Sequence, residues 1–338
     1  MIKIRHIGVI FTLFVATIFL NTSFVYADEV DLDMDGVEDS LEELLIDKYA
    51  PSYYFHTDEK YYSDNVDEYL SKAHMRFHYR ALPDDQILEQ GNVNQENLAY
   101  MKHNNKDFWG NYTEEIIYSK DARDVYGAGG FFLEIPDNYD NKDDVYKGDI
   151  DGHRSKIYAH LFKNESGNIS IQYWVFLPYN EAPSVGGVKL NHEGDWEHIT
   201  VRLDESYGIE KVYFASHNNE GKYYNKKELL FGNGDDLIKK NYNEDEGNTH
   251  VIVYLALGTH ASFPTSGTQY RGWYLPNDYT SEGKCLHGKG STLNIGEKEA
   301  PLNNQKFIQY GGLWGEIGNT IISTGPKSPS FQESWMKD

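Results

Sequence analysis

Five short runs of branched and aromatic residues in the second half of the chain most constrain its fold. Glycine, asparagine and aspartate separate the runs, as turn residues separate the strands of antiparallel proteins. The runs are Ile157 to Phe162, Ile169 to Leu177, Ile199 to Leu203, Lys211 to Ala215 and Val251 to Leu257. This pattern predicts a mainly β fold, an antiparallel sandwich or barrel. Short peripheral helices are expected at Val66 to Ala73 and Gln95 to Lys102.

The segment from His192 to His198 reads His-Glu-Gly-Asp-Trp-Glu-His and leads into the third run. Alternation from Asp195 onward places Asp195 and Glu197 on one face, above the apolar residues that follow. Two adjacent carboxylates repel unless a hard cation neutralises both. Gly194 lets the chain bend so that His192 can add a nitrogen ligand. We expect a divalent-cation site here; the alternative is that Lys or Arg pairs with the acids and that His192 and His198 are structural.

A second acidic segment, from Asp31 to Glu42, fits the twelve-residue calcium loop at each diagnostic position. Gly36 occupies the turn position, and an exiting helix from Ser40 to Tyr49 is expected before Pro51. The predicted ligands are Asp31, Asp33, Asp35, the carbonyl of Val37, Asp39 and Glu42. We expect a calcium clip that orders the amino terminus, the alternative being a disordered acidic leader.

The amino terminus has the pattern of a secretory signal. Lys3 and Arg5 precede an apolar run from Ile7 to Leu20, and Val25-Tyr26-Ala27 fits a signal-peptidase site. The expected organisation is a signal peptide at 1–27, the calcium loop and helix at 28–48, and a β domain at 49–338. The expected location is therefore extracellular, with no transmembrane segment after cleavage. An uncleaved anchor is the alternative.

The net charge limits the classes of binding partner, and the cysteine content limits the sources of stability. The net charge of −22 makes nucleic acid an unfavourable partner. The single cysteine, Cys285, cannot form an internal disulfide, so stability must come from core burial and bound metal.

Several motifs, in order, resemble the vacuolar protein sorting-associated protein 62 family. The resemblance extends from about Tyr49 to the carboxyl end. Its motifs are Tyr49-Ala50-Pro51, Glu59-Lys60-Tyr61, Gly148-Asp149, Tyr173 to Asn180, Gly194 to His198, Val201 to Leu203, Val212 to His217, and Gly258 to Pro264.

The same stretch is distantly similar to the necrosis- and ethylene-inducing-like proteins, secreted β-sandwich cytolysins with the signature Gly-His-Arg-His-Asp-Trp-Glu. This resemblance implies a sandwich and a calcium or magnesium ion held by His192, Asp195 and Glu197. It adds Asn180, which stands where that group has a ligating aspartate, and it places His217 and His260 near the cation. Asn180 brings no charge, and Gly194 replaces the second histidine of the signature.

Three functions compete. The favoured one is a secreted β-sandwich protein, either cytolysin-like or purely binding, whose cation bridges to a lipid headgroup or glycan at a cell surface. A passive extracellular module with structural metals ranks second. Last is a metal-dependent hydrolase of phosphodiesters or glycosides, with His198, His217 or His260 transferring protons. The chain matches no zinc-protease helix, serine elbow or phosphate-binding glycine loop, so a binding protein is favoured over an enzyme.

Overall fold

The computed structural model describes residues 30–124, 129–184, 187, 189–217, 220–234, 239–272, 275–318, 320 and 323–337. The expected signal peptide, residues 1–27, lies outside them.

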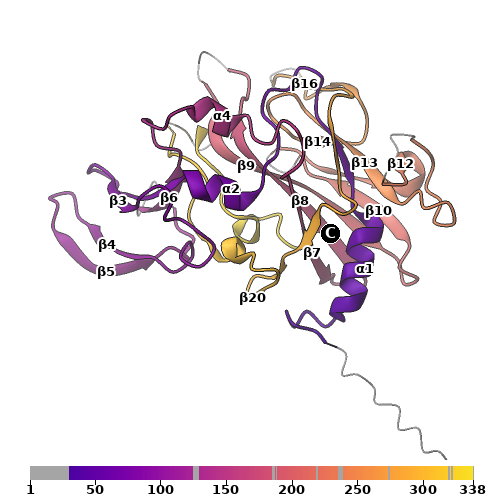
Figure 1. Ribbon diagram of the computed structural model, residues 1–338, viewed down its shortest axis with the longest axis horizontal. Helices are drawn as coiled ribbons and strands as arrows, with labels where there is room; N and C mark the ends of the chain where they lie inside the picture. The colour runs from indigo at the N-terminus through magenta and orange to yellow at the C-terminus, as the bar shows by residue number, and fades with distance from the viewer. Residues whose placement is uncertain are drawn as a thin grey trace, which may run out of the picture.

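A six-stranded sheet forms the centre of the molecule (Figure 1). Its strands are, in spatial order, β11 (Lys222–Asn225), β10 (Ile209–Phe214), β9 (His192–Leu203), β8 (Ile169–Asn180), β7 (Ile157–Lys163) and β18 (Thr292–Asn294). Neighbours from β11 to β7 are antiparallel, whereas β18 pairs with β7 in parallel. The long β8–β9 ladder carries the acidic segment to one end of this sheet.

A second sheet packs over one face of the first. Its order is β12 (Phe231–Gly232), β13 (His250–Leu255), β1 (Ser52–Tyr54) and β17 (Cys285–His287), with β14 (Ser262–Phe263) also paired to β13. The first strand of the chain, β1, is inserted between two late strands and runs parallel to β13. The predicted mainly β sandwich is confirmed, with two parallel pairings in a largely antiparallel structure.

Two buried cores lie on opposite faces of the central sheet. The core between the two sheets contains apolar residues of β7, β8, β9, β10, β13 and β1, including Ile199, Val201 and Val253. The core on the other face contains Trp174, Trp196 and Trp314 and is covered by the smaller elements. Because both faces are buried, β8 shows an almost continuous apolar run in place of strict alternation.

The smaller elements surround these sheets. The remaining strands are β2 (His74–His78), β3 (Asp85–Leu88) and β6 (Gly130–Glu134) in one sheet, with the pairs β4 (Lys102–Lys106) and β5 (Tyr112–Tyr118), β15 (Gly267–Gln269) and β16 (Asp278–Thr280), and β19 (Gly296–Glu297) and β20 (Ala300–Pro301). The helices are α1 (Asp39–Tyr49), α2 (Val66–Lys72), α4 (Lys142–Tyr146) and the 3₁₀ turns η1 (Lys226–Glu228), η2 (Lys306–Gln309) and η4 (Pro329–Phe331). Within the described ranges, no helix is both long and apolar enough to cross a bilayer.

The local predictions were largely correct. All five predicted strands form, and α1 and α2 lie where helices were expected. The helix expected at Gln95 to Lys102 is wrong: the segment is a set of turns, and Lys102 already begins β4. The Asn94 side chain accepts from the amides of Glu96 and Asn97, which favours a local turn over a continuing helix.

Candidate cation site at the end of the sandwich

Strand β9 places the two central carboxylates as the alternation predicted. Asp195 lies opposite Leu177 of β8, and Glu197 lies opposite Val175. Farther along the same face, Ile199 enters the core between the sheets, whereas Trp196 enters the core on the other side. The carboxylates therefore lie at one end of the space between the two sheets.

Gly194 has two structural roles before this pair. Its φ is +62°, a left-handed conformation that glycine adopts without steric cost. A Cβ at this position would lie 2.0 Å from the carbonyl oxygen of Trp314, which packs directly against the bend. His192, on the other side of the bend, has its Nδ1 2.7 Å from the carbonyl oxygen of Gly194 and is partly exposed.

A buried histidine links Asp195 to a second carboxylate. His260 donates from Nδ1 to Asp195 Oδ2 at 3.2 Å, and its Nε2 lies 3.6 Å from Glu59 Oε2. The Gly258 amide also donates to Glu59 Oε2, at 2.9 Å. Burial opposes charge on His260, but its two carboxylate partners raise its pKa to about 10. Burial likewise opposes charge on Glu59, yet His260 and the backbone donors lower the pKa of Glu59 to about 2. His260 thus lies between two carboxylates that favour its charged form.

Glu197 has no such partner. Burial first, and the charge of Asp195 second, raise the pKa of Glu197 well above its usual value. Across the described residues, no hydrogen bond or ion pair to the Glu197 side chain is present, so Lys and Arg do not neutralise it. Its charged form is costly unless a cation binds beside it.

Asn180 supplies a buried oxygen without a donor. Its Nδ2 donates to Asp195 Oδ2 at 2.9 Å, and its Oδ1 has no hydrogen-bond partner among the residues described. Amide oxygens are good ligands for hard cations. The donor set of two carboxylates, an amide oxygen and the imidazole of His192 therefore fits calcium or magnesium in chemistry.

The other predicted histidines lie in different environments. His217 pairs with Asp278 at 2.6 Å, and Thr259 donates to the other oxygen of Asp278 at 2.8 Å. Burial lowers the pKa of His198 to about 3, and its ring stacks on Trp174 at 4.0 Å. His198 is one residue out of phase with Asp195 and Glu197, so it lies on the opposite face of β9.

Sequence reasoning missed Glu59 and Asp278 as members of this cluster. Glu59 lies in the resembling segment Glu59-Lys60-Tyr61, which was a usable signal. Asp278 begins the short strand β16 and is brought near the site only by tertiary packing.

A cavity of about 670 Å³ opens beside His192. The rings of Tyr146 and Tyr179 stack in its wall at 4.6 Å. Lys142 and Lys189 also line it, and Lys142 pairs with the buried Glu193 at 3.1 Å. The cavity therefore combines aromatic surface with both lysine and glutamate side chains next to a predicted ligand.

The acidic amino-terminal loop is ordered and compact. Carboxylate oxygens of Asp33, Asp35 and Glu42 all lie within 4.8 Å of one another, and so do those of Asp31, Asp33 and Asp39. In the part of the chain that the structure describes, these are the only triads of acids or histidines so closely spaced. The groups at the end of the sandwich are spread more widely.

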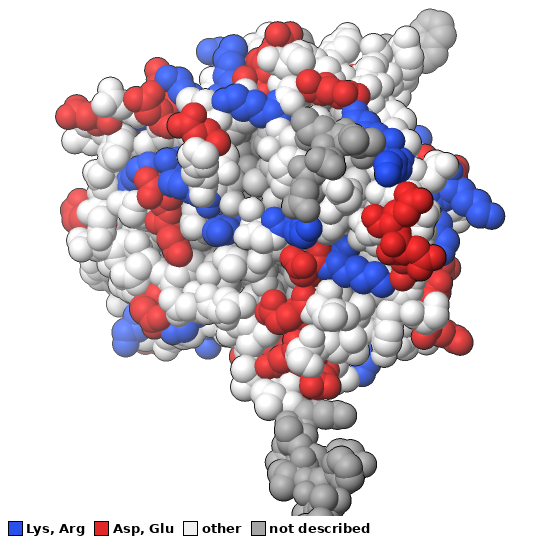
Figure 2. Space-filling view, turned by 45° about the vertical axis from the view of Figure 1, so that its right-hand side comes forward, with Lys and Arg blue, Asp and Glu red and all other residues white. Residues whose placement is uncertain are grey.

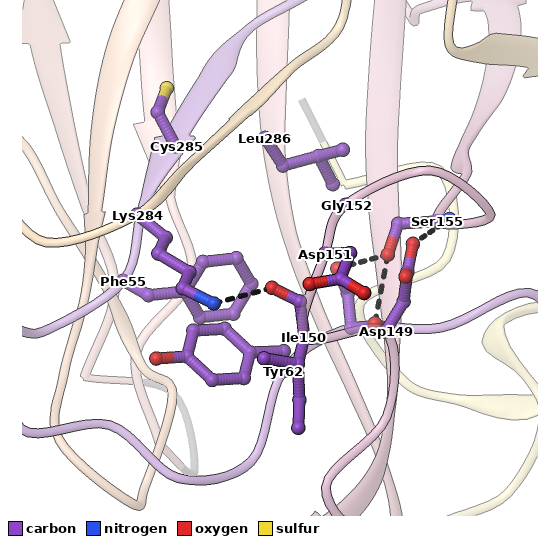
Figure 3. A pocket seen from close by; sticks show the side chains of 11 residues that line it. Phe55, Tyr62, Asp149, Ile150, Asp151, Gly152, Ser155, Lys284, Cys285 and Leu286 are labelled. Carbon is purple, nitrogen blue, oxygen red and sulfur yellow. Dashed lines mark hydrogen bonds between the residues drawn. The ribbon is translucent and has the colours of Figure 1, made fainter.

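A second, smaller cavity of about 320 Å³ lies between β1, β17 and the turn at Asp149 to Gly152 (Figure 3). The Asp149 carboxylate accepts from the amides of Arg154 and Ser155 and holds this turn. The Phe55 and Tyr62 rings form the opposite wall, and Lys284 donates to the Ile150 carbonyl at 2.5 Å.

The structure is a two-sheet β-sandwich. Acidic and histidine side chains gather at one end of it, beside the β8–β9 ladder. Residues 122–315 match the family model of vacuolar protein sorting-associated protein 62. The chain belongs to this family, as the motifs predicted. The match includes Asn180, His192, Asp195, Glu197, His217 and His260 but not the loop at Asp31 to Glu42.

Two yeast proteins are similar over most of the chain. TDA6 of Saccharomyces cerevisiae, named as a candidate vacuolar protein sorting-associated protein, is 25% identical over 351 residues, covering 93% of this chain and 71% of TDA6. Vacuolar protein sorting-associated protein 62 of the same organism is 24% identical over 320 residues, covering 88% of this chain and 63% of that protein.

Similar solved structures are toxin-fold proteins. Necrosis and ethylene inducing protein 2, from the causal agent of cocoa's witches' broom disease, is 16% identical over 65% of this chain and 67% of that one, with a TM-score of 0.29. A structure titled as a toxin fold for microbial attack and plant defense is 13% identical over 78% and 77% of the two chains, with a TM-score of 0.31.

Proposed function

We propose that this chain is a secreted, divalent-cation-binding β-sandwich protein that attaches to a lipid headgroup or glycan at a cell surface. The observation that carries the proposal is the state of Glu197. This carboxylate lies on the same strand face as Asp195 and has no cationic partner among the described residues, and Asn180, which donates to Asp195, keeps an Oδ1 without a donor. A calcium or magnesium ion would satisfy all three groups.

Each residue has a distinct role in this proposal. Asp195, Glu197, Asn180 and His192 are the ligands. His260, held by Glu59, positions the Asp195 carboxylate, as residues behind metal ligands commonly do. The cation supplies a positive centre for hydroxyl or phosphate oxygens of the headgroup.

The cavity beside His192 supports the choice of ligand. A ring face can stack on a sugar, and the Lys189 ammonium can donate to headgroup oxygens, whereas Lys142 is already paired with Glu193.

A hydrolase is less well supported. Its proposed proton carriers were His198, His217 and His260. His198 lies on the other face of β9, and His260 is fully buried between Glu59 and Asp195, which leaves only His217, paired with Asp278, of the three proposed proton carriers.

The test measures metal and binding together. Wild type and Asp195→Asn are dialysed against calcium or magnesium, analysed for metal content, and then mixed with phosphatidylcholine vesicles that carry either a glycosylated or a phosphate-bearing lipid. We expect Asp195→Asn to lose one equivalent of metal and at least about tenfold in vesicle affinity, because one lost charge-assisted contact is worth about 1.4 kcal/mol or more.

Asp151→Asn is the matched control, since Asp151 is an exposed carboxylate outside this end of the sandwich. It should bind metal and vesicles as wild type does. Equal metal content in wild type and Asp195→Asn would overturn the cation site, and vesicle binding that survives chelation would overturn the bridge.

A further inference from the structure

The amino-terminal acidic loop lies far from the site above, at the edge of the sandwich where β7 and β18 pair. Lys163 of β7 donates to the Gly36 carbonyl, and Asn294 of β18 donates to Glu42 Oε2 at 2.7 Å. Figure 2 shows acidic side chains gathered at the end of the molecule where the described chain begins. The loop is therefore docked on the sandwich and is not a free leader.

Several carboxylate oxygens of this loop have no donor among the described residues, and two of the acids that carry them, Asp33 and Glu42, are buried. Asp33 is 3% exposed, and neither of its oxygens has a hydrogen-bond partner within the described ranges. Glu42 is fully buried, and its Oε1 is also without a partner. Asp31 Oδ1 and Asp35 Oδ2 also have no hydrogen-bond partner in the described part of the chain. One cation bound among these oxygens would neutralise them. Buried carboxylates so close together are strongly unfavourable unless a cation lies among them.

The backbone conformation fits the same interpretation. Gly36 has a φ of +85° at the turn of the loop, and its amide donates to Asp31 Oδ2 at 3.0 Å. Loops of this kind bring alternate acidic residues around one point, with a following glutamate supplied by the first turn of a helix. Here that helix is α1, and Glu42 lies in its first turn.

We propose that this loop binds one calcium ion and that the ion fastens α1 and the amino-terminal segment to the β7–β18 edge. The side-chain ligands are Asp31, Asp33, Asp35, Asp39 and Glu42. The Val37 carbonyl occupies the remaining protein position of the loop pattern. A donor set made only of oxygens, with more than six atoms available, selects calcium over zinc and suits the larger calcium ion better than magnesium.

The proposed attachment of the amino-terminal segment also depends on how the carboxyl end of α1 packs. Leu45, Ile46 and Tyr49 are buried in the core between the sheets, and the Tyr49 hydroxyl donates to the Tyr207 carbonyl. The helix is therefore anchored by apolar packing at its carboxyl end and by the acidic loop at its amino end. Without the ion, repulsion among the carboxylates acts to lift the loop from the sheet edge.

The experiment counts calcium in a two-by-two design on the whole purified chain. Wild type, Asp33→Ala, Asp195→Asn and the double variant are dialysed against calcium and analysed for bound metal. We expect Asp33→Ala to lose one equivalent whether or not Asp195 is intact. Glu42→Gln serves as a second loop variant should Asp33→Ala fold poorly, and Asp47→Ala, at an exposed acid on the same helix, is the matched control.

Limited digestion with a glutamate-specific protease reports the fastening. Chelation should expose cleavage at Glu38 or Glu43 in wild type and in Asp195→Asn, at least about tenfold faster than with calcium, while Asp33→Ala is cleaved fast in both conditions. Equal calcium content in wild type and both loop variants would overturn the site. Protection that is indifferent to chelation would overturn the fastening, and neither result depends on the cation proposed at Asp195.

Discussion

At the scale of single residues, Gly194 connects the proposed cation site to the core that contains Trp314. Its left-handed backbone turns the chain between His192 and Asp195, and its missing side chain lets the Trp314 carbonyl pack against the bend. The spacing of the sequence indicated a bend at Gly194. It did not indicate the contact with Trp314, because that contact joins residues far apart in the chain.

Gly194→Ala should therefore lower the free energy of unfolding by at least about 2 kcal/mol, from the left-handed strain and the displaced backbone together. Gly167→Ala is the matched control, because Gly167 also has a positive φ, of +80°, but a Cβ there would meet nothing within 4 Å. It should cost only about 1 kcal/mol. Denaturant titration of both variants measures the difference, and equal losses would contradict a role for the Trp314 contact.

At the scale of secondary-structure elements, α1 shows what periodicity could and could not predict. The calcium-loop pattern and Pro51 predicted a helix from Ser40 to Tyr49, and the structure has Asp39–Tyr49. The sequence did not predict that this helix packs against β7, β13 and β18. Contacts of that kind depend on residues that arrive much later in the chain, so no local pattern encodes them.

Ile46→Ala on this helix should lower the free energy of unfolding by about 2 to 5 kcal/mol, because it leaves a cavity in the main core. Leu44→Ala, at a position on the same helix that is 60% exposed, should change it by no more than about 0.5 kcal/mol. Thermal and denaturant unfolding of the pair measures the contrast. A similar small effect of both substitutions would show that α1 does not contribute to the cooperative core.

At the scale of the whole molecule, the sequence predicted the sandwich and the face of β9 but not the order of its strands. Branched runs identify strands, yet they do not say which strand lies beside which. The same limit explains the site: Asp195 and Glu197 follow from alternation within one strand, whereas Glu59 and Asp278 join them from separate loops and edge strands. On the surface, acidic and basic side chains are interspersed over the face shown in Figure 2.

The carboxyl-terminal part is expected to be essential to the fold. Removing residues 300–338 would remove Trp314, Phe307 and Tyr310, which are fully buried in the second core. Each loss of this size costs about 3 to 5 kcal/mol, so their sum exceeds the usual stability of a domain. We expect the truncated chain to lack a cooperative thermal transition by circular dichroism, and a sharp transition near that of the full chain would contradict this.

The position of β1 has a consequence for biosynthesis. Ser52 pairs with Ile252 on one side and with His287 on the other, so its two neighbours are made about two hundred residues after it. At about 5 to 20 residues per second, a ribosome needs about 10 to 40 s to cover that distance. Throughout that interval a strand that is fully buried in the finished protein has neither of its hydrogen-bonding neighbours.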